Sequence, residues 1–207
     1  IEGRSPGGFT AIPEVDLRRW DGSPAQQQAL ADDLRAIAHH VGFFQLVGHG
    51  VPDALRARYF DALAEFFALP EPVKATIDKA RSRHFRGWER VGAELTDNRV
   101  DHREQLDLST EWPPHPGDAQ PPYLRLDGPN QWLADDVLPG FRSVVAEMIG
   151  RLGALADRLM EVLSVGLGLA PGHLRAVFGE RPHSLVKLIS YPPTPPGEAG
   201  VNAHHDA

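Results

Sequence analysis

The chain has 207 residues, of which 42% are hydrophobic and 24% are charged, a composition typical of a globular protein. Its formal net charge of −7 provides no basic surface for nucleic acid or anionic lipid, so neither is an expected partner. It contains no cysteine, which excludes disulfides, thiol nucleophiles and cysteine-ligated metal sites, and no apolar run approaches the roughly 18 residues of a membrane span.

The first predicted elements are a strand and a helix. Residues 1–4 spell the recognition sequence of a common tag-removal protease, and we interpret them as a tag remnant outside the fold. The basic and apolar blocks of a secretory signal are lacking, so we expect a cytoplasmic protein. Residues 12–17 roughly alternate apolar and polar side chains, which predicts a short edge strand. Ser23 and Pro24 then have the pattern of a helix cap and first helical residue, and the helix is expected to end at Gly42.

The middle of the chain combines apolar and highly charged segments. Residues 43–47 predict a second strand. A further helix is expected to begin at Asp53, and its Phe66 and Phe67 are expected in the core, because buried aromatic rings dominate core area. Residues 81–111 interleave arginines with acidic residues, and this density of mixed charge predicts a solvated surface.

Helices are expected to dominate most of the chain, and strands its end. The longest predicted helix covers residues 139–166, with apolar residues three or four positions apart. Residues 185–191 have strand character, and residues 200–206 predict the next strand. We therefore divide the chain into a helix-rich region, 5–180, and the start of a β-structured core, 181–207. This order of elements indicates an α+β fold.

The residues best suited to bind a metal ion lie together near the end of the sequence. On a strand, residues two apart share a face, so His204 and Asp206 would project together, with His205 on the opposite face. An imidazole and a carboxylate supply two of the three ligands of the 2-His-1-carboxylate triad, which leaves positions on Fe(II) open to a cosubstrate and dioxygen. The spacing leaves two alternatives open: a zinc site with the same ligands, or a solvent-facing loop tip.

Several segments, taken in order, resemble the isopenicillin N synthase-like 2-oxoglutarate/Fe(II) dioxygenases. Each segment is short, but the ordered set covers almost all of residues 12–206. The segments are IPEVDL (12–17), GFFQLVGHGV (42–51), FFALP (66–70), RGW (86–88) followed by Glu94, DHRE (101–104), GPNQW (128–132), LPGFR (138–142), YPP (191–193) and HHD (204–206).

The resemblance implies a double-stranded β-helix, or jelly-roll, core on which the N-terminal helical region packs, with only the first core strands in residues 181–207. It implies His204 and Asp206 as the first two Fe(II) ligands. Tyr191 lies where the family often places a tyrosine that contacts 2-oxoglutarate, or the substrate in members that do not use it; a packed strand aromatic is the alternative. The implied cosubstrates are 2-oxoglutarate and O2, and the implied partner is a small organic substrate that is hydroxylated, desaturated or cyclised with release of succinate and CO2.

Some positions depart from the family pattern. Ile189 replaces a common asparagine, Gly48 stands where plant members have asparagine, and Phe85 stands where isopenicillin N synthase carries an arginine for its tripeptide, which argues against that substrate. The third iron ligand, a histidine, and the Arg-x-Ser that binds 2-oxoglutarate would lie beyond Ala207. We therefore expect a longer enzyme and an inactive 207-residue chain. The alternative functions are a 2-oxoglutarate-independent Fe(II) oxidase or cyclase and a non-catalytic fragment.

Overall fold

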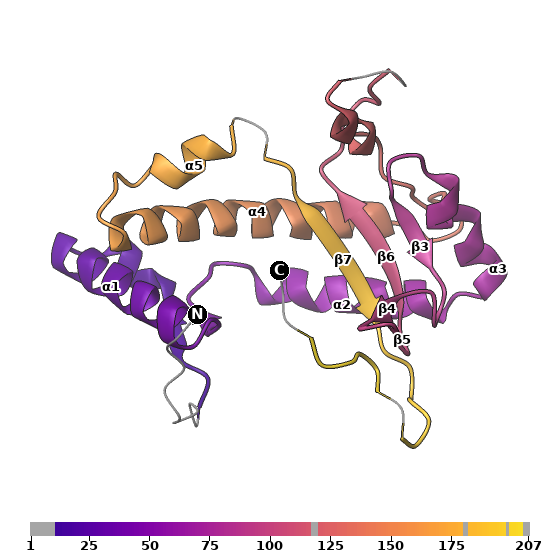
Figure 1. Cartoon of the computed structure of the whole chain (residues 1–207), viewed down its shortest axis with the longest axis horizontal. Helices are drawn as coiled ribbons and strands as arrows, with labels where there is room; N and C mark the ends of the chain where they lie inside the picture. The colour runs from indigo at the N-terminus through magenta and orange to yellow at the C-terminus, as the bar shows by residue number, and fades with distance from the viewer. Residues whose placement is uncertain (1–10, 117–119, 180–181, 198, 205–207) are drawn as a thin grey trace. The chain divides into compact units, whose positions relative to one another are not determined.

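The computed structural model divides into two compact units (Figure 1). One unit comprises Ile1–Pro52 and Gly150–Arg181, and the other comprises Asp53–Ile149 and Pro182–Ala207. Helix α4 (Phe141–Gly166) contributes its first part to the second unit and its remainder to the first. The residues that the structure describes are 11–116, 120–179, 182–197 and 199–204.

The first unit joins two short parallel strands to helices through an apolar core. Its elements are β1 (Glu14–Asp16), η1 (Leu17–Asp21), α1 (Pro24–His40), β2 (Gln45–Val47), the later part of α4, and α5 (His173–Val177). Strands β1 and β2 are parallel, with Val15 opposite Leu46, and α1 supplies the crossover that a parallel pair needs. The buried core consists of Val15, Leu17, Leu30, Ala31, Leu34 and Val162.

Helix α1 begins at the residue that the sequence predicts. Ser23 Oγ accepts a hydrogen bond from the Gln26 N–H at 3.4 Å, and Gln26 Oε1 accepts one from the Ser23 N–H at 2.9 Å. This reciprocal capping box satisfies two backbone donors that a helix start would leave unpaired. Pro24 occupies the first turn, where a missing N–H costs no helical hydrogen bond. The predicted cap and helix are therefore confirmed.

The glycines inside α4 allow a stability prediction. Gly153 is exposed, and no atom lies within 4 Å of the place where a Cβ would stand. We expect Gly153→Ala to raise the free energy of unfolding by about 0.5–1 kcal/mol, because glycine loses more backbone entropy in a helix. Gly166→Ala is the matched control: its Cβ would lie 2.6 Å from the Ala31 carbonyl oxygen, so it is expected to destabilise. Urea denaturation followed by circular dichroism measures both, and effects of the same sign would contradict this explanation.

The second unit contains an antiparallel sheet with helices on one of its faces. Strand β6 (Glu104–Ser109) lies between β3 (Gly87–Glu89) and β7 (Leu185–Ser190), and Leu106 is opposite both Trp88 and Leu188. Strands β4 and β5 form a separate two-stranded hairpin. The elements are α2 (Asp53–Ala68), α3 (Glu71–Lys74), η2 (Ala75–Ile77), η3 (Lys79–Arg81), β3 (Gly87–Glu89), β4 (Leu95–Thr96), β5 (Arg99–Val100), β6 (Glu104–Ser109), η4 (Pro122–Leu126), the first part of α4, and β7 (Leu185–Ser190).

The core of this unit lies between the sheet and helices α2 and α4 (Figure 1). Trp88 and Leu106 from the sheet pack in one cluster with Phe66 from α2 and Phe141 from α4. The rings of Phe66 and Phe141 are stacked, with their centroids 4.9 Å apart. Phe67 is partly buried against the same cluster, so the prediction that the phenylalanine pair belongs to the core is confirmed. Helices that cover one face of an antiparallel sheet also confirm the α+β class.

The charged stretch 81–111 is only in part the solvated surface that its composition predicts: most of residues 90–100 are exposed, but residues 86–88 and 104–109 are buried. It contains β3 and β6, and β6 is buried along its whole length. Its charges are paired inside the unit: Lys74 Nζ lies 2.7 Å from Glu104 Oε2, and Lys79 Nζ lies 2.6 Å from Asp107 Oδ2. Both lysines precede the stretch in sequence. The prediction is wrong for β6, because its charged side chains find buried partners elsewhere in the chain.

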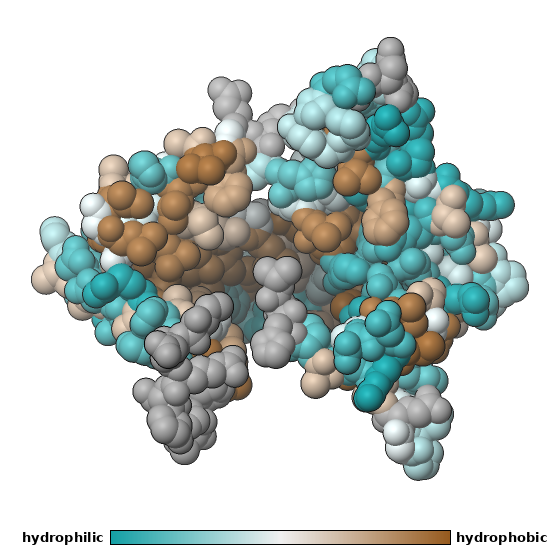
Figure 2. Space-filling view, viewed as in Figure 1, coloured by the Kyte–Doolittle hydropathy of each residue, from teal (hydrophilic) through white to brown (hydrophobic). Residues whose placement is uncertain are grey.

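One face of the molecule shows where exposed hydrophobic residues gather (Figure 2). Hydrophobic residues gather over α5 and the turn before it, where Leu167, Leu169, Val177 and Phe178 are exposed. Hydrophilic residues predominate over the sheet of the second unit in the same view. Within the described ranges, no helix combines the length and the apolar composition needed to cross a membrane.

Candidate metal and cofactor site

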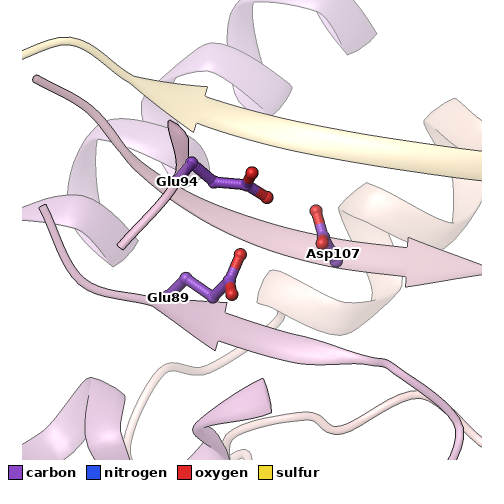
Figure 3. A group of neighbouring side chains, drawn as sticks. All are labelled: Glu89, Glu94 and Asp107. Atoms are coloured by element: carbon purple, nitrogen blue, oxygen red, sulfur yellow. The ribbon is translucent and has the colours of Figure 1, made fainter. Parts of the chain in front are cut away.

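A network of charged side chains lies on the sheet face opposite the apolar core. Glu89 is on β3, Asp107 on β6 and Lys187 on β7, while Lys79 comes from η3 and Glu94 from the segment between β3 and β4. Lys79 Nζ lies 2.6 Å from Asp107 and 3.0 Å from Glu89, and Lys187 Nζ lies 3.2 Å from Glu94. Figure 3 shows the three carboxylates pointing toward one another. Alternation along β6 explains this polar face, because Leu106 points to the core and Asp107 away from it.

The three carboxylates are close enough to hold a cation, because one oxygen from each lies within 4.8 Å of the others. An ammonium group already stands among them: Lys79 Nζ lies between 2.6 and 3.8 Å from Asp107, Glu89 and Glu94. Gln105 Nε2 donates to the same three carboxylates. We therefore interpret this cluster as a structural ion-pair network.

Ion pairing outweighs burial in setting two pKa values of the network. Burial lowers the pKa of Lys79, but its hydrogen bonds to Asp107 and Glu89 more than compensate and hold this pKa above its usual value. Burial raises the pKa of Glu94, but attraction and hydrogen bonding from Lys187 more than compensate and hold this pKa below its usual value. Both groups are therefore charged at neutral pH.

The lowered pKa of Glu94 predicts sensitivity to acid. A carboxyl with a lower pKa in the folded state adds stability above its unfolded pKa, and this contribution is lost as the pH falls through the folded value. We expect the free energy of unfolding to decline below about pH 4.5, the ordinary pKa of this group, and Lys187→Met to flatten that decline. Lys79 has the opposite sign, and its contribution is lost only as the pH rises above 10.5. Urea denaturation of both proteins across the acid range measures this, and parallel curves would contradict it.

Tyr191, the predicted cofactor contact, directly follows β7 and is half exposed. Its ring lies against the backbone of Gly200, where an added Cβ would stand 2.9 Å from Tyr191 Cδ1. Only a residue without a side chain allows this close approach. The structure thus brings Tyr191 beside the segment that leads to His204, with one side of its ring packed on that segment.

His204, the first predicted metal ligand, is exposed, and its Nδ1 lies 2.7 Å from the carbonyl oxygen of Asn202. Because a carbonyl oxygen only accepts hydrogen bonds, Nδ1 is the donor in this contact. Metal-binding histidines are commonly oriented in this way, by donation from the other ring nitrogen to a backbone carbonyl. The orientation of His204 therefore fits that of a metal ligand whose Nδ1 donates to the backbone.

Asp206, the second predicted ligand, lies outside the described residues, as does His205. The described part of the predicted strand, residues 200–204, is irregular. Its Asn202 uses the backbone N and the side-chain Nδ2 to contact Asp101 Oδ1, at 3.4 and 3.3 Å. The strand prediction is wrong for this part, because a side-chain carboxylate takes the place of a neighbouring strand as the hydrogen-bond partner.

Asp101 is a residue of this site that the sequence did not indicate. It is fully buried, accepts from Thr96 Oγ1 at 2.6 Å and pairs with Arg103 at 3.2 Å. The one available signal was the DHRE motif at residues 101–104, which marks the family without showing what its aspartate holds.

Comparison with known proteins decides the family. A family model described as "non-haem dioxygenase in morphine synthesis N-terminal" matches residues 12–135. The chain belongs to this family. The resemblance inferred from the ordered motifs is thereby confirmed.

The relatives are longer than the region over which they match this chain. The chain is 33% identical over 207 residues to the 2-oxoglutarate-dependent dioxygenase frbJ of Dothideomycetidae sp. (strain 11243), covering 96% of this chain and 54% of that protein. A 2OG-Fe(II) oxygenase family protein from Caulobacter crescentus has a TM-score of 0.75 at 22% identity, over 95% of this chain and 61% of its own. JOX2, solved in complex with 2OG, Fe and JA, has a TM-score of 0.65 at 26% identity, over 89% of this chain and 49% of its own. The chain thus spans about half the length of the curated relatives it matches.

Proposed function

We propose that this protein is a non-haem Fe(II), 2-oxoglutarate-dependent oxygenase. Its reaction would hydroxylate, desaturate or cyclise a small organic molecule and release succinate and CO2. The observation that carries the proposal is His204 at the H-x-D position of a chain from the dioxygenase family, with its ring oriented by the contact of Nδ1 with the carbonyl oxygen of Asn202 at 2.7 Å. The matched relatives are named as 2-oxoglutarate-dependent enzymes, which favours this reaction over the 2-oxoglutarate-independent alternative.

His204 and Asp206 are the residues we propose to hold Fe(II), and Tyr191 the residue we propose to contact 2-oxoglutarate. The bound iron would supply the activation of dioxygen at the open positions of its coordination shell. The chain's own contribution is orientation. The Asn202 carbonyl fixes the ring of His204, and the half-exposed Tyr191 offers a phenolic hydroxyl that can donate to a carboxylate. We keep residues 181–207 as the proposed start of the catalytic core and 5–180 as the helix-rich region.

The partner that we propose is a small-molecule substrate. The location that we propose for the protein is the cytoplasm. JOX2 was solved with such a molecule, JA, beside 2OG and Fe. The net charge of −7 disfavours nucleic acid and anionic membranes as partners.

The test combines metal analysis with product analysis on the purified full-length protein, because the 207-residue chain by itself is expected to be inactive. We expect anaerobically added Fe(II) to bind, and succinate to form when 2-oxoglutarate and O2 are supplied. His204→Ala and Asp206→Ala are expected to lose the iron, whereas His39→Ala, at the last turn of α1, is expected to keep it. Bound iron with turnover but no succinate would support the 2-oxoglutarate-independent alternative. Tight zinc in place of iron would support the zinc alternative, and binding of neither metal would overturn the enzyme proposal.

A further inference from the structure

The fully buried carboxylate of Asp101 connects two parts of the second unit. Its Oδ2 accepts from Thr96 Oγ1 at 2.6 Å and lies 3.2 Å from Arg103. Its Oδ1 accepts from Asn202 N at 3.4 Å and from Asn202 Nδ2 at 3.3 Å. One oxygen is thus held by the β4–β5 hairpin and the residues before β6, and the other is left to hold a segment about 100 residues later in the chain.

The residue that Asp101 holds is the same residue that orients His204. The N–H and side chain of Asn202 point to Asp101, and its carbonyl oxygen accepts from His204 Nδ1 at 2.7 Å. The ring of His204 is therefore linked to a buried charge through a single intervening residue. Two contacts from one residue to the same carboxylate oxygen hold Asn202 at both its backbone and its side chain.

We propose that Asp101 is a positioning residue for the metal ligand His204, acting through Asn202. This inference rests on the proposed function, because it assigns Asp101 to the same iron site. Arg103 and Thr96 hold the carboxylate in place on one side, and Asn202 transmits that position to the imidazole on the other. Outer partners of metal-binding histidines commonly set metal affinity by fixing the ring and its tautomer.

The tautomer of His204 tests this inference without any metal. Long-range ¹H–¹⁵N spectra distinguish a proton on Nδ1 from one on Nε2, and His204→Gln assigns the signal. We expect the Nδ1–H form in the wild-type protein. Asn202→Ala and Asp101→Ala are expected to shift His204 toward the Nε2–H form that a free imidazole favours. Asp101→Asn, which keeps one oxygen for Asn202, is expected to restore most of the wild-type signal.

Thr96→Val is the matched control, because it removes a hydrogen bond from the other oxygen of the same carboxylate. It is expected to lower stability without moving the His204 signal. Asn202→Ala leaves the buried carboxylate and its pairing with Arg103 intact, so it remains informative if Asp101→Ala does not fold. A folded Asn202→Ala that keeps the wild-type signal, or a Thr96→Val that shifts it equally, would overturn the proposal.

A Co²⁺ titration of the full-length protein separates this proposal from the proposed function. We expect Asn202→Ala to bind Co²⁺ about tenfold more weakly than the wild-type protein, at the lower end of the effects of outer partners. If the wild-type protein binds no Co²⁺ while the tautomer still responds to Asn202→Ala, the control of His204 by Asp101 is supported and the metal function fails. If Co²⁺ binds and the tautomer does not respond, the metal function is supported and the positioning role fails.

Discussion

Replacement of Glu104 by glutamine is expected to lower the free energy of unfolding by about 3 kcal/mol. Glu104 Oε2 lies 2.7 Å from Lys74 Nζ and accepts from Trp88 Nε1 at 2.8 Å, and all three residues are buried. The substitution leaves a buried ammonium without its carboxylate, and the remaining bond from Lys74 to the Phe67 carbonyl, at 2.9 Å, does not neutralise the charge. Glutamine keeps an oxygen for Trp88, which places the effect at the lower end of the range for broken buried pairs.

Urea denaturation at neutral pH measures this effect against a solvent-exposed pair. Arg58 and Glu147 lie 2.8 Å apart with both side chains exposed, so Arg58→Met is expected to cost less than about 1 kcal/mol. The double variant Lys74→Met/Glu104→Gln is expected to be more stable than Glu104→Gln alone, because it removes the unpaired charge. If Glu104→Gln were no less stable than Arg58→Met, the buried pair of Lys74 and Glu104 would not contribute more to stability than an exposed pair.

The second large effect is expected at Lys79. Lys79→Met leaves Asp107, which is 1% exposed, together with Glu89 and Glu94, and only Lys187 remains to neutralise them. We expect a loss of about 3–5 kcal/mol at neutral pH, since three carboxylates then face one another without their central cation. The loss should shrink as the pH falls, because protonation removes the repulsion.

Lys187, the other lysine of the same network, provides the matched control for Lys79. Lys187 is about one-third exposed, so Lys187→Met is expected to cost clearly less than Lys79→Met. Lys79→Met/Asp107→Asn removes one buried charge of each sign and is expected to recover part of the lost stability. Urea denaturation of the single and double variants measures this coupling. Strictly additive losses would mean that Lys79 and Asp107 do not stabilise each other.

Elements with local signals were predictable from the sequence. Ser23, Pro24 and Gln26 lie within four residues, and together they define the start of α1. The helical spacing around Phe66 places its ring in a core, as the stacked pair with Phe141 confirms. The motifs along residues 12–206 identify the family, because each is a short local pattern and their order is preserved.

Contacts between distant residues were not predictable in this way. The charges of residues 81–111 have the composition of a solvated surface, yet β6 is buried because Lys74 and Lys79 pair with its acidic side chains. Local composition contains no information on such partners. The expected strand at residues 200–204 fails for the same reason, since its hydrogen bonds go to a buried side chain.

The sequence by itself determined the family, the α+β class and the candidate ligands His204 and Asp206, because these depend on local motifs and spacing. Only the tertiary structure decided which side chains from distant parts of the chain pair with one another. It shows that Lys79 stands among the three carboxylates that would otherwise suit a cation, and that Asp101 holds Asn202 and thereby the ring of His204. Burial strengthens the pairings of Lys79 with Asp107 and of Asp101 with Arg103, and burial is set by the packing of segments that are far apart in the chain.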